Sequence, residues 1–300
     1  MLERGRQIMY DYTMQMKSHP FARIFSGDKT IDHAGLNRLG VQVFRMLAAR
    51  AFYRIRPRAV DDRVESVVRE VRQNGIVMIH DFLPPDTFEA VRSEYKQLAG
   101  NPSVWSTLTR GSNVQRLAYA NDMDILLIPG ASAYFFDNPI IRAIFSALEK
   151  LPLEHLRVTR AFEELTHGAD GKHDPETTFH SDIFFNTHKA WLYLDDVTLD
   201  HGPLAYVKRS HLFHARQLAA TYNDSCSRNQ GSRRIPDEEI AARGLNESFC
   251  VCPKNTLLVA NTFGYHRRVQ GRAGMRRIAV QLAARAQSPF QLALPSFLVR

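Results

Sequence analysis

The sequence has few cysteines and no long apolar segment. Three cysteines in 300 residues are too few for the disulfide framework of a small secreted domain. No segment approaches the roughly 18 consecutive apolar residues that a membrane-spanning helix needs. The N-terminal residues are charged and lack the apolar stretch of a secretory signal. We therefore expect a cytoplasmic protein, with peripheral attachment to a membrane as an alternative.

Signatures of several common enzyme classes are also absent. The chain contains neither the phosphate-binding pattern G-x-x-x-x-G-K-[ST] nor the dinucleotide-binding pattern G-x-G-x-x-G. The G-x-S-x-G pattern of serine hydrolases is missing too. These absences argue against a phosphate-loop nucleotide hydrolase, a nicotinamide-dependent dehydrogenase and an α/β hydrolase.

Positive charge, by contrast, is abundant and concentrated near the N-terminus. The net charge is +8, and residues 1–60 hold eleven Lys or Arg against four Asp or Glu. A local basic field favours an anionic partner. Residues 34–60 are therefore candidates for contact with an acyl thioester, a carrier protein or a membrane surface, whereas we expect no nucleic acid. The alternative is that these residues only support the core.

Residues 1–74 are expected to form a basic helical region that packs on or beside the core. Apolar residues recur there at helical spacing, and Pro57 and Gly75 are residues that typically end helices. Two more helices are expected inside the following domain. The predicted helical segments are 34–57, 61–74, 86–100 and 138–150.

From residue 75 onward most of the chain consists of short apolar runs separated by turn residues. Many short strands at such spacing are typical of a sandwich or barrel, so residues 75–300 are expected to form one mainly β domain. Segment 212–247 is a polar insertion, and long insertions are often lids or binding loops. We predict that it is a lid. Strands are predicted at 75–83, 114–120, 156–165, 177–185, 189–197, 203–207, 248–252, 255–261 and 276–284.

The stretch His180-Ser181-Asp182 is the most informative part of the sequence. Alternate residues of a strand point to the same side, so His180 and Asp182 can bind one metal ion while Ser181 points away. A second histidine, His266, lies at the end of another predicted strand. Two histidines and one carboxylate are the ligands of non-haem Fe(II) oxygenases. Three protein ligands leave room for a bidentate co-substrate and O₂, so this set predicts oxidation chemistry.

Two adjacent arginines, Arg276 and Arg277, begin the strand that follows His266. A dicarboxylate co-substrate needs a cation near the metal, and a guanidinium group binds a carboxylate through two hydrogen bonds. Adjacent strand residues face opposite ways, so only one of these arginines can point towards the metal.

The stretch from 178 to 213 resembles the phytanoyl-CoA dioxygenase family of Fe(II)- and 2-oxoglutarate-dependent oxygenases. It contains the H-x-D pair, a strand with Trp191 and a Gly202-Pro203-Leu204 turn, although Lys208-Arg209 replaces the Pro-Gly of the family pattern. The resemblance extends over residues 75–285. It implies a mainly β fold with flanking α-helices, namely a cupin-like jelly roll or double-stranded β-helix.

The resemblance also implies roles for single residues. The H-x-D pair and His266 match the metal ligands of the family. Arg277 matches the arginine that binds the distal carboxylate of 2-oxoglutarate, and Arg276 is the alternative. Trp191 matches an aromatic residue beside 2-oxoglutarate, and Thr262 lies where a side chain can reach this co-substrate.

The implied activity is hydroxylation of an aliphatic C–H bond in a small-molecule or acyl/lipid-type substrate. An anionic group on this substrate would suit the basic N-terminal region. Fe(II) would be the metal, 2-oxoglutarate and O₂ the co-substrates, and succinate and CO₂ the co-products. Asp182 stands where a halogenase would need an open site for chloride, which argues against halogenation. The alternatives are a cupin-type metal enzyme that does not use 2-oxoglutarate, and a non-catalytic binding protein on an oxygenase scaffold.

Overall fold

The computed structural model describes residues 22–56, 61–120, 127–169, 171–227, 232–284 and 289–290. The first 21 residues of the predicted N-terminal region, residues 57–60 of the basic segment and residues 228–231 of the predicted lid lie outside this description. Among the helices of the described residues, none combines the length and the apolar character that crossing a bilayer requires.

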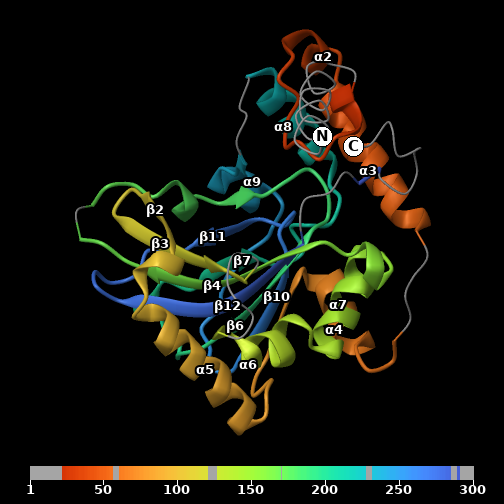
Figure 1. Cartoon of the computed structure of the whole chain (residues 1–300). Coiled ribbons are helices and arrows are strands. Elements are labelled where there is room, and N and C mark those ends of the chain that lie inside the picture. Colours follow the sequence, from red (N-terminus) through yellow and green to blue (C-terminus); the bar gives the residue numbers. More distant parts are fainter. Residues whose placement is uncertain are drawn as a thin grey trace, which may run out of the picture.

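Two antiparallel sheets face each other and form the body of the molecule (Figure 1). This arrangement confirms the predicted jelly roll. The larger sheet has the strand order β1 (Ile76–Ile79), β10 (Leu257–Asn261), β6 (His188–Tyr193), β12 (Arg276–Ala284), β4 (Val158–Thr166), β3 (Asn113–Tyr119) and β2 (Ser106–Arg110). The smaller sheet has the order β8 (Arg233–Arg234), β5 (His180–Ser181), β11 (His266–Arg268), β7 (Leu204–Val207) and β9 (Glu247–Phe249).

Helices cover the outer face of the seven-stranded sheet. Alternate strand residues such as Leu192, Val259 and Val280 are fully buried in one apolar cluster with Val91 and Phe145 from the helices. Burial of this cluster away from water is the main stabilising contribution on this side. The covering elements are α4 (Glu65–Asn74), α5 (Pro85–Ala99), α6 (Pro129–Ala131), the π-helix η5 (Ser132–Phe136) and α7 (Pro139–Glu149).

The remaining strand residues point between the two sheets. Trp191, Tyr193 and Leu258 of the larger sheet pack with Leu204 and Tyr206 of the smaller one. The space between the two sheets is apolar around these residues and is lined by polar side chains near His180 and Asp182. Short 3₁₀ helices lie in the connections that precede strands, at η2 (Pro102–Val104), η6 (Leu153–His155), η7 (Pro175–Thr177) and η8 (Leu199–His201).

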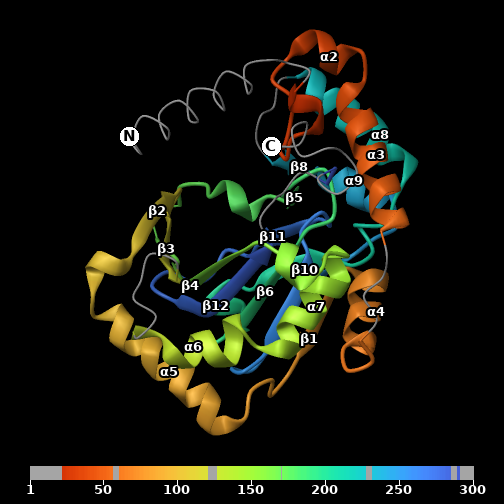
Figure 2. The same cartoon turned by 45° about the vertical axis from the view of Figure 1, so that its right-hand side comes forward.

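The N-terminal segment and the insertion pack against each other at one end of the sandwich (Figures 1 and 2). The helix predicted at 34–57 is divided at Gly40, whose φ of 78° is left-handed. A continuous α-helix does not include such a residue, so the chain changes direction there. The elements at this end are η1 (Ala22–Phe25), α2 (Ala34–Arg38), α3 (Val41–Ile55), α8 (Ala215–Cys226) and α9 (Asp237–Ala242).

Two strand predictions near the candidate ligands were wrong in extent. The strand predicted at 177–185 is only His180–Ser181, and the N–H of Asp182 then donates to Thr262 O at 3.0 Å. The strand expected to reach His266 ends at Asn261. A turn follows, and His266 begins β11 in the other sheet. Apolar patterning indicates extended chain but does not show where a strand leaves its sheet.

Candidate metal centre

Three side chains distant in sequence meet on the five-stranded sheet. His180 on β5 and His266 on β11 are register partners in an antiparallel pair, and Asp182 follows β5 directly. One ligand atom from each residue lies within 4.8 Å of the other two. The strand pairing explains this convergence, because paired residues place their side chains about 5 Å apart on one face.

Main-chain carbonyls orient both imidazole rings. His180 Nδ1 lies 2.9 Å from Thr178 O, and His266 Nδ1 lies 2.9 Å from Gly264 O. A carbonyl only accepts hydrogen bonds, so in the neutral form of each ring Nδ1 carries the proton and Nε2 keeps its lone pair. These Nε2 atoms lie 3.7 Å and 3.6 Å from Asp182 Oδ1. Three lone pairs therefore face one point, and the carbonyls fix the rings as in protein metal sites.

Lys189 on β6 holds the candidate carboxylate ligand. Its Nζ lies 2.7 Å from Asp182 Oδ2, which leaves Oδ1 directed towards the histidines. Burial alone would raise the pKa of Asp182, but Lys189 and then His266 hold that pKa well below its usual range. Burial, followed by the neighbouring His266, lowers the pKa of His180. The residues thus offer a carboxylate and neutral imidazole, which are the protonation states that metal binding requires.

One of the two candidate arginines shares a cavity with these residues. Arg277 points between the sheets, lines the cavity and donates through Nη1 to Gly202 O. Arg276 points to the outer side of the sheet, where its side chain is 55% exposed and lies 3.7 Å from Glu164. The structure therefore brings Arg277, and not Arg276, to the candidate ligands.

The other two candidate residues differ in position. Trp191 lines the same cavity, and its Nε1 donates to Glu163 Oε2 at 3.1 Å. Thr262 is fully buried, and its hydroxyl donates to Thr187 O at 3.3 Å. Thr262 is not among the residues that line the cavity. Its side chain supports the turn before His266 instead.

A carboxylate that sequence reasoning missed stands beside the candidate ligands. Glu176 Oε2 lies 3.2 Å from His180 Nε2, and Glu176 Oε1 lies 2.8 Å from Arg110 and 3.3 Å from Arg234. Although burial would raise the pKa of Glu176, the neighbouring His180 and then Arg110 and Arg234 hold that pKa below its usual range. Glu176 belongs to η7, whose N-cap is Asp174. The Asp-Pro-Glu sequence indicates a helix start, but nothing in it indicates a role at the cavity.

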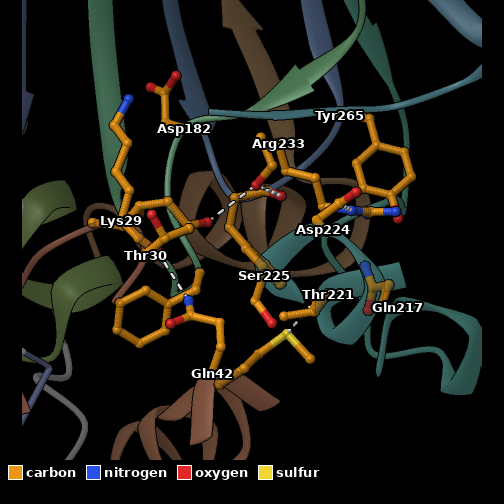
Figure 3. Close-up of a pocket in the computed structure, with 15 residues that line it drawn as sticks. Lys29, Thr30, Gln42, Asp182, Gln217, Thr221, Asp224, Ser225, Arg233 and Tyr265 are labelled. Carbon is orange, nitrogen blue, oxygen red and sulfur yellow. Dashed lines mark hydrogen bonds and ion pairs between the residues drawn. The ribbon is translucent and has the colours of Figure 1, made fainter. Parts of the chain in front are cut away.

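A second cavity lies on the other side of Asp182, under the helices at the end of the sandwich (Figure 3). We call it the lid cavity. Its walls come from the N-terminal segment, from α8 of the insertion and from the turn before His266. Asp182 is the residue that lines both cavities. Residues of the lid cavity include Lys29, Gln42, Met46, Phe184, Thr221 and Phe263.

The jelly roll and its group of two histidines and one carboxylate define a class, the non-haem oxygenases that depend on Fe(II) and 2-oxoglutarate. The chain is thus an oxidoreductase of this class. A model described as phytanoyl-CoA dioxygenase (PhyH) matches residues 71–243, which is more than half of the chain. The chain belongs to this family, as its sequence predicted.

Solved structures share the fold at low sequence identity. The α-ketoglutarate-dependent epimerase SnoN from nogalamycin biosynthesis is 16% identical, with a TM-score of 0.53 over 74% of this chain and 82% of its own. SnoN in complex with Fe³⁺, α-ketoglutarate and nogalamycin RO is 14% identical, with a TM-score of 0.51 over the same shares of the two chains. Identities this low show a common fold only. Among curated proteins the chain has no match.

Proposed function

We propose that the protein hydroxylates an aliphatic C–H bond of a small organic substrate. In this reaction the substrate, 2-oxoglutarate and O₂ give the alcohol, succinate and CO₂. The observation that carries the proposal is a single cavity that the three candidate ligands and Arg277 line together. A metal-binding group and a cation for a dicarboxylate are the two parts that the reaction requires.

The residues present fit Fe(II). His180 and His266 would bind it through Nε2 and Asp182 through Oδ1, because the other ring nitrogens and Oδ2 already have partners. Bound Fe(II) supplies the centre at which O₂ is activated at the expense of 2-oxoglutarate. The protein contributes orientation: Lys189 holds the carboxylate, and Arg277 would bind the distal carboxylate of 2-oxoglutarate.

The lid cavity is the proposed substrate site. It adjoins Asp182, and Met46, Phe184 and Phe263 give it mostly apolar walls. Lys29 adds a cation, whose Nζ donates to Ser232 Oγ at 2.6 Å. Asp224 and Arg233 also line the cavity, but they pair with each other at 2.6 Å. Apolar walls with a few polar groups are typical of small-molecule sites. These features support an acyl- or lipid-type substrate with an anionic group, and the small molecule bound to SnoN supports the same size class.

The test is co-substrate turnover by protein that is first stripped of metal and then reconstituted. With Fe(II), ascorbate and a panel of fatty acids and acyl thioesters, we expect stoichiometric succinate and a hydroxylated product. Asp182→Ala should lower succinate formation at least about a hundredfold, because even the loss of a group that only hydrogen-bonds to a metal ligand costs about 10–100-fold. The matched control is Asp86→Ala on the exposed start of α5, which should react as the wild type does.

Two other results would overturn the proposal. Tight Fe(II) binding with oxidation of a substrate but no 2-oxoglutarate consumption would identify a different cupin-type enzyme. Binding of an organic ligand without turnover, unchanged by Asp182→Ala, would identify a binding protein. Both readouts use the same purified preparation, so the three outcomes are distinguishable.

A further inference from the structure

Helix α3 buries two polar side chains beside two apolar ones and exposes apolar side chains on its other face. The buried face consists of Gln42, Arg45, Met46 and Ala49. Arg45 is completely buried and donates to three main-chain carbonyls and to Gln42 Oε1. The side of α3 towards the lid cavity is therefore fixed by polar contacts as well as by packing.

The opposite face of α3 is apolar and exposed. Phe44, Leu47 and Ile55 are 55%, 42% and 77% exposed. With Ala51 they recur at intervals of three or four residues, so they lie on one face of the helix. We call these four residues the apolar stripe. Both views place α3 at the periphery of the molecule (Figures 1 and 2).

Arginines border the apolar stripe without acidic counterparts. Residues 33–60 contain six arginines and no Asp or Glu. Arg50 and Arg54, on one flank of the stripe, form no ion pair with any of the described residues. They line a pocket between α3 and α4 together with Arg72. No Asp or Glu is among the described residues that line this pocket, although Glu149 binds His188 of the lining at 2.8 Å. Arg50 lies 4.9 Å from the ring centroid of Phe213, and burial and then the neighbouring Arg54 lower its pKa to about 10.

The partner of such a face must offer both an apolar medium and negative charge. An apolar helix face with flanking Lys or Arg is the composition of helices that lie in a membrane interface. Anionic headgroups attract basic residues near the surface, and the acyl region accepts side chains such as Phe and Leu. Water alone satisfies neither requirement. Apolar side chains gathered on one exposed face usually mark a site that binds a membrane or another molecule.

We propose that α3 docks the protein on the surface of an anionic phospholipid bilayer. The apolar stripe enters the headgroup region, and the pocket of Arg50, Arg54 and Arg72 receives a headgroup phosphate. The opposite side of the same helix carries Gln42 and Met46 of the lid cavity. Docking therefore places that cavity one helix away from the lipid. The proposal does not depend on the oxidation reaction, and either one can fail alone.

The experiment is co-sedimentation of the full chain with vesicles. We compare phosphatidylcholine alone with phosphatidylcholine that contains about one-third phosphatidylglycerol, at about 50 mM and about 500 mM salt. We expect binding to the anionic vesicles that weakens with salt. Arg50→Gln/Arg54→Gln should reduce binding about tenfold or more and remove most of the salt dependence. Phe44→Ser/Leu47→Ser should reduce binding about tenfold or more and leave the salt dependence in place.

Matched controls lie away from α3. Lys96→Gln, at an exposed position of α5, and Leu108→Ser, 45% exposed on β2, should bind as the wild type does. Thermal melting verifies that each variant is folded. The proposal is overturned if anionic vesicles bind no more protein than neutral ones, or if the controls weaken binding as much as the α3 variants. A homodimer in light scattering that Phe44→Ser/Leu47→Ser dissociates would also overturn it, because the stripe would then belong to a second copy.

Discussion

Single side chains decide the chemistry of the cavity, and their orientation depends on strand alternation. Arg276 and Arg277 are neighbours in sequence, yet one faces the helices and the other faces the candidate ligands. Lys189 and Trp191 share the inner side of β6 for the same reason. Charge is nearly balanced within the cavity, since Lys189 pairs with Asp182 and Glu176 pairs with Arg110. A dicarboxylate that enters would find Arg277 without a carboxylate partner among the described residues.

The two arginines provide a matched pair of variants. We expect Arg277→Gln to raise the KM for 2-oxoglutarate at least about 30-fold, because losing one partner of a buried charge pair costs about 2 kcal/mol or more. Arg276→Gln should change this KM less than about twofold, because the Arg276 side chain is 55% exposed and lies on the other side of the sheet from the cavity. Steady-state succinate formation measures both. Equal effects of the two changes would contradict the assignment of Arg277.

At the scale of elements, the N-terminal segment is joined to the lid cavity through buried polar contacts. Arg45 of α3 binds the main-chain oxygens of Ile24, Ser26 and Asp28 at 2.9 Å each. Its guanidinium group also lies 4.2 Å from the ring centroid of Phe184, near the H-x-D pair. These contacts hold the chain that leads to Lys29 and Thr30 in the wall of the cavity. Arg45 thus connects the basic region to the active-site end of the sandwich.

Replacing Arg45 should therefore loosen this segment. Arg45→Met leaves three partly buried main-chain carbonyls without their donor, and a carbonyl that water cannot reach costs about 1–3 kcal/mol. We expect residues 22–40 to become sensitive to limited proteolysis and the melting temperature to fall. Arg38→Met, an exposed arginine on α2, is the control and should match the wild type. Unchanged proteolysis of Arg45→Met would show that apolar packing alone holds the segment.

At the scale of the whole molecule, two buried histidines that are not candidate ligands make the free energy of unfolding depend on pH. His167 is enclosed by two loops: a side chain at Gly202 or Gly271 would meet its ring within 2.2 Å or 2.4 Å. Its Nε2 lies 3.1 Å from His201 O, and its Nδ1 accepts the N–H of Gly271. Burial lowers the pKa of His167 to about 4, and burial lowers that of His211 to about 4 as well. Both rings are neutral in the folded protein at pH 7.

Stability should fall as the pH decreases from about 6.5 to about 4. In this range the unfolded chain binds protons on these histidines, whose usual pKa is about 6.5, while the folded chain does not. Above about pH 6.5 both histidines are neutral in the folded and unfolded chains and do not reduce the free energy of unfolding. Between about pH 6.5 and 4 the protons bound only by the unfolded chain lower it. Melting temperatures at successive pH values measure the decrease. His167→Gln should flatten it, whereas His155→Gln, an exposed histidine, should not. A parallel decrease in both variants would refute the role of His167.

Much of the architecture follows from the sequence because its signals are local. The H-x-D spacing, the alternation at the arginine pair and the period of the apolar residues each need only one strand or helix. They predicted a mainly β domain and a candidate metal pair, whereas the resemblance of residues 75–285 to a known family implied the jelly roll. Helix α7 was expected at 138–150 and extends over Pro139–Glu149. The helix expected at 34–57 was broken because a single left-handed residue, Gly40, outweighed an otherwise helical pattern.

The tertiary structure decided which distant residues meet. His266 joins His180 only because β11 pairs with β5, and Lys189 joins Asp182 only because the two sheets face each other. Glu176 comes from a connection that carries no recognisable motif. Sequence alone predicted the kind of chemistry, since residue types and local spacing indicate the candidate ligands. Long-range strand pairing determined the geometry, because no local pattern records which strands become neighbours.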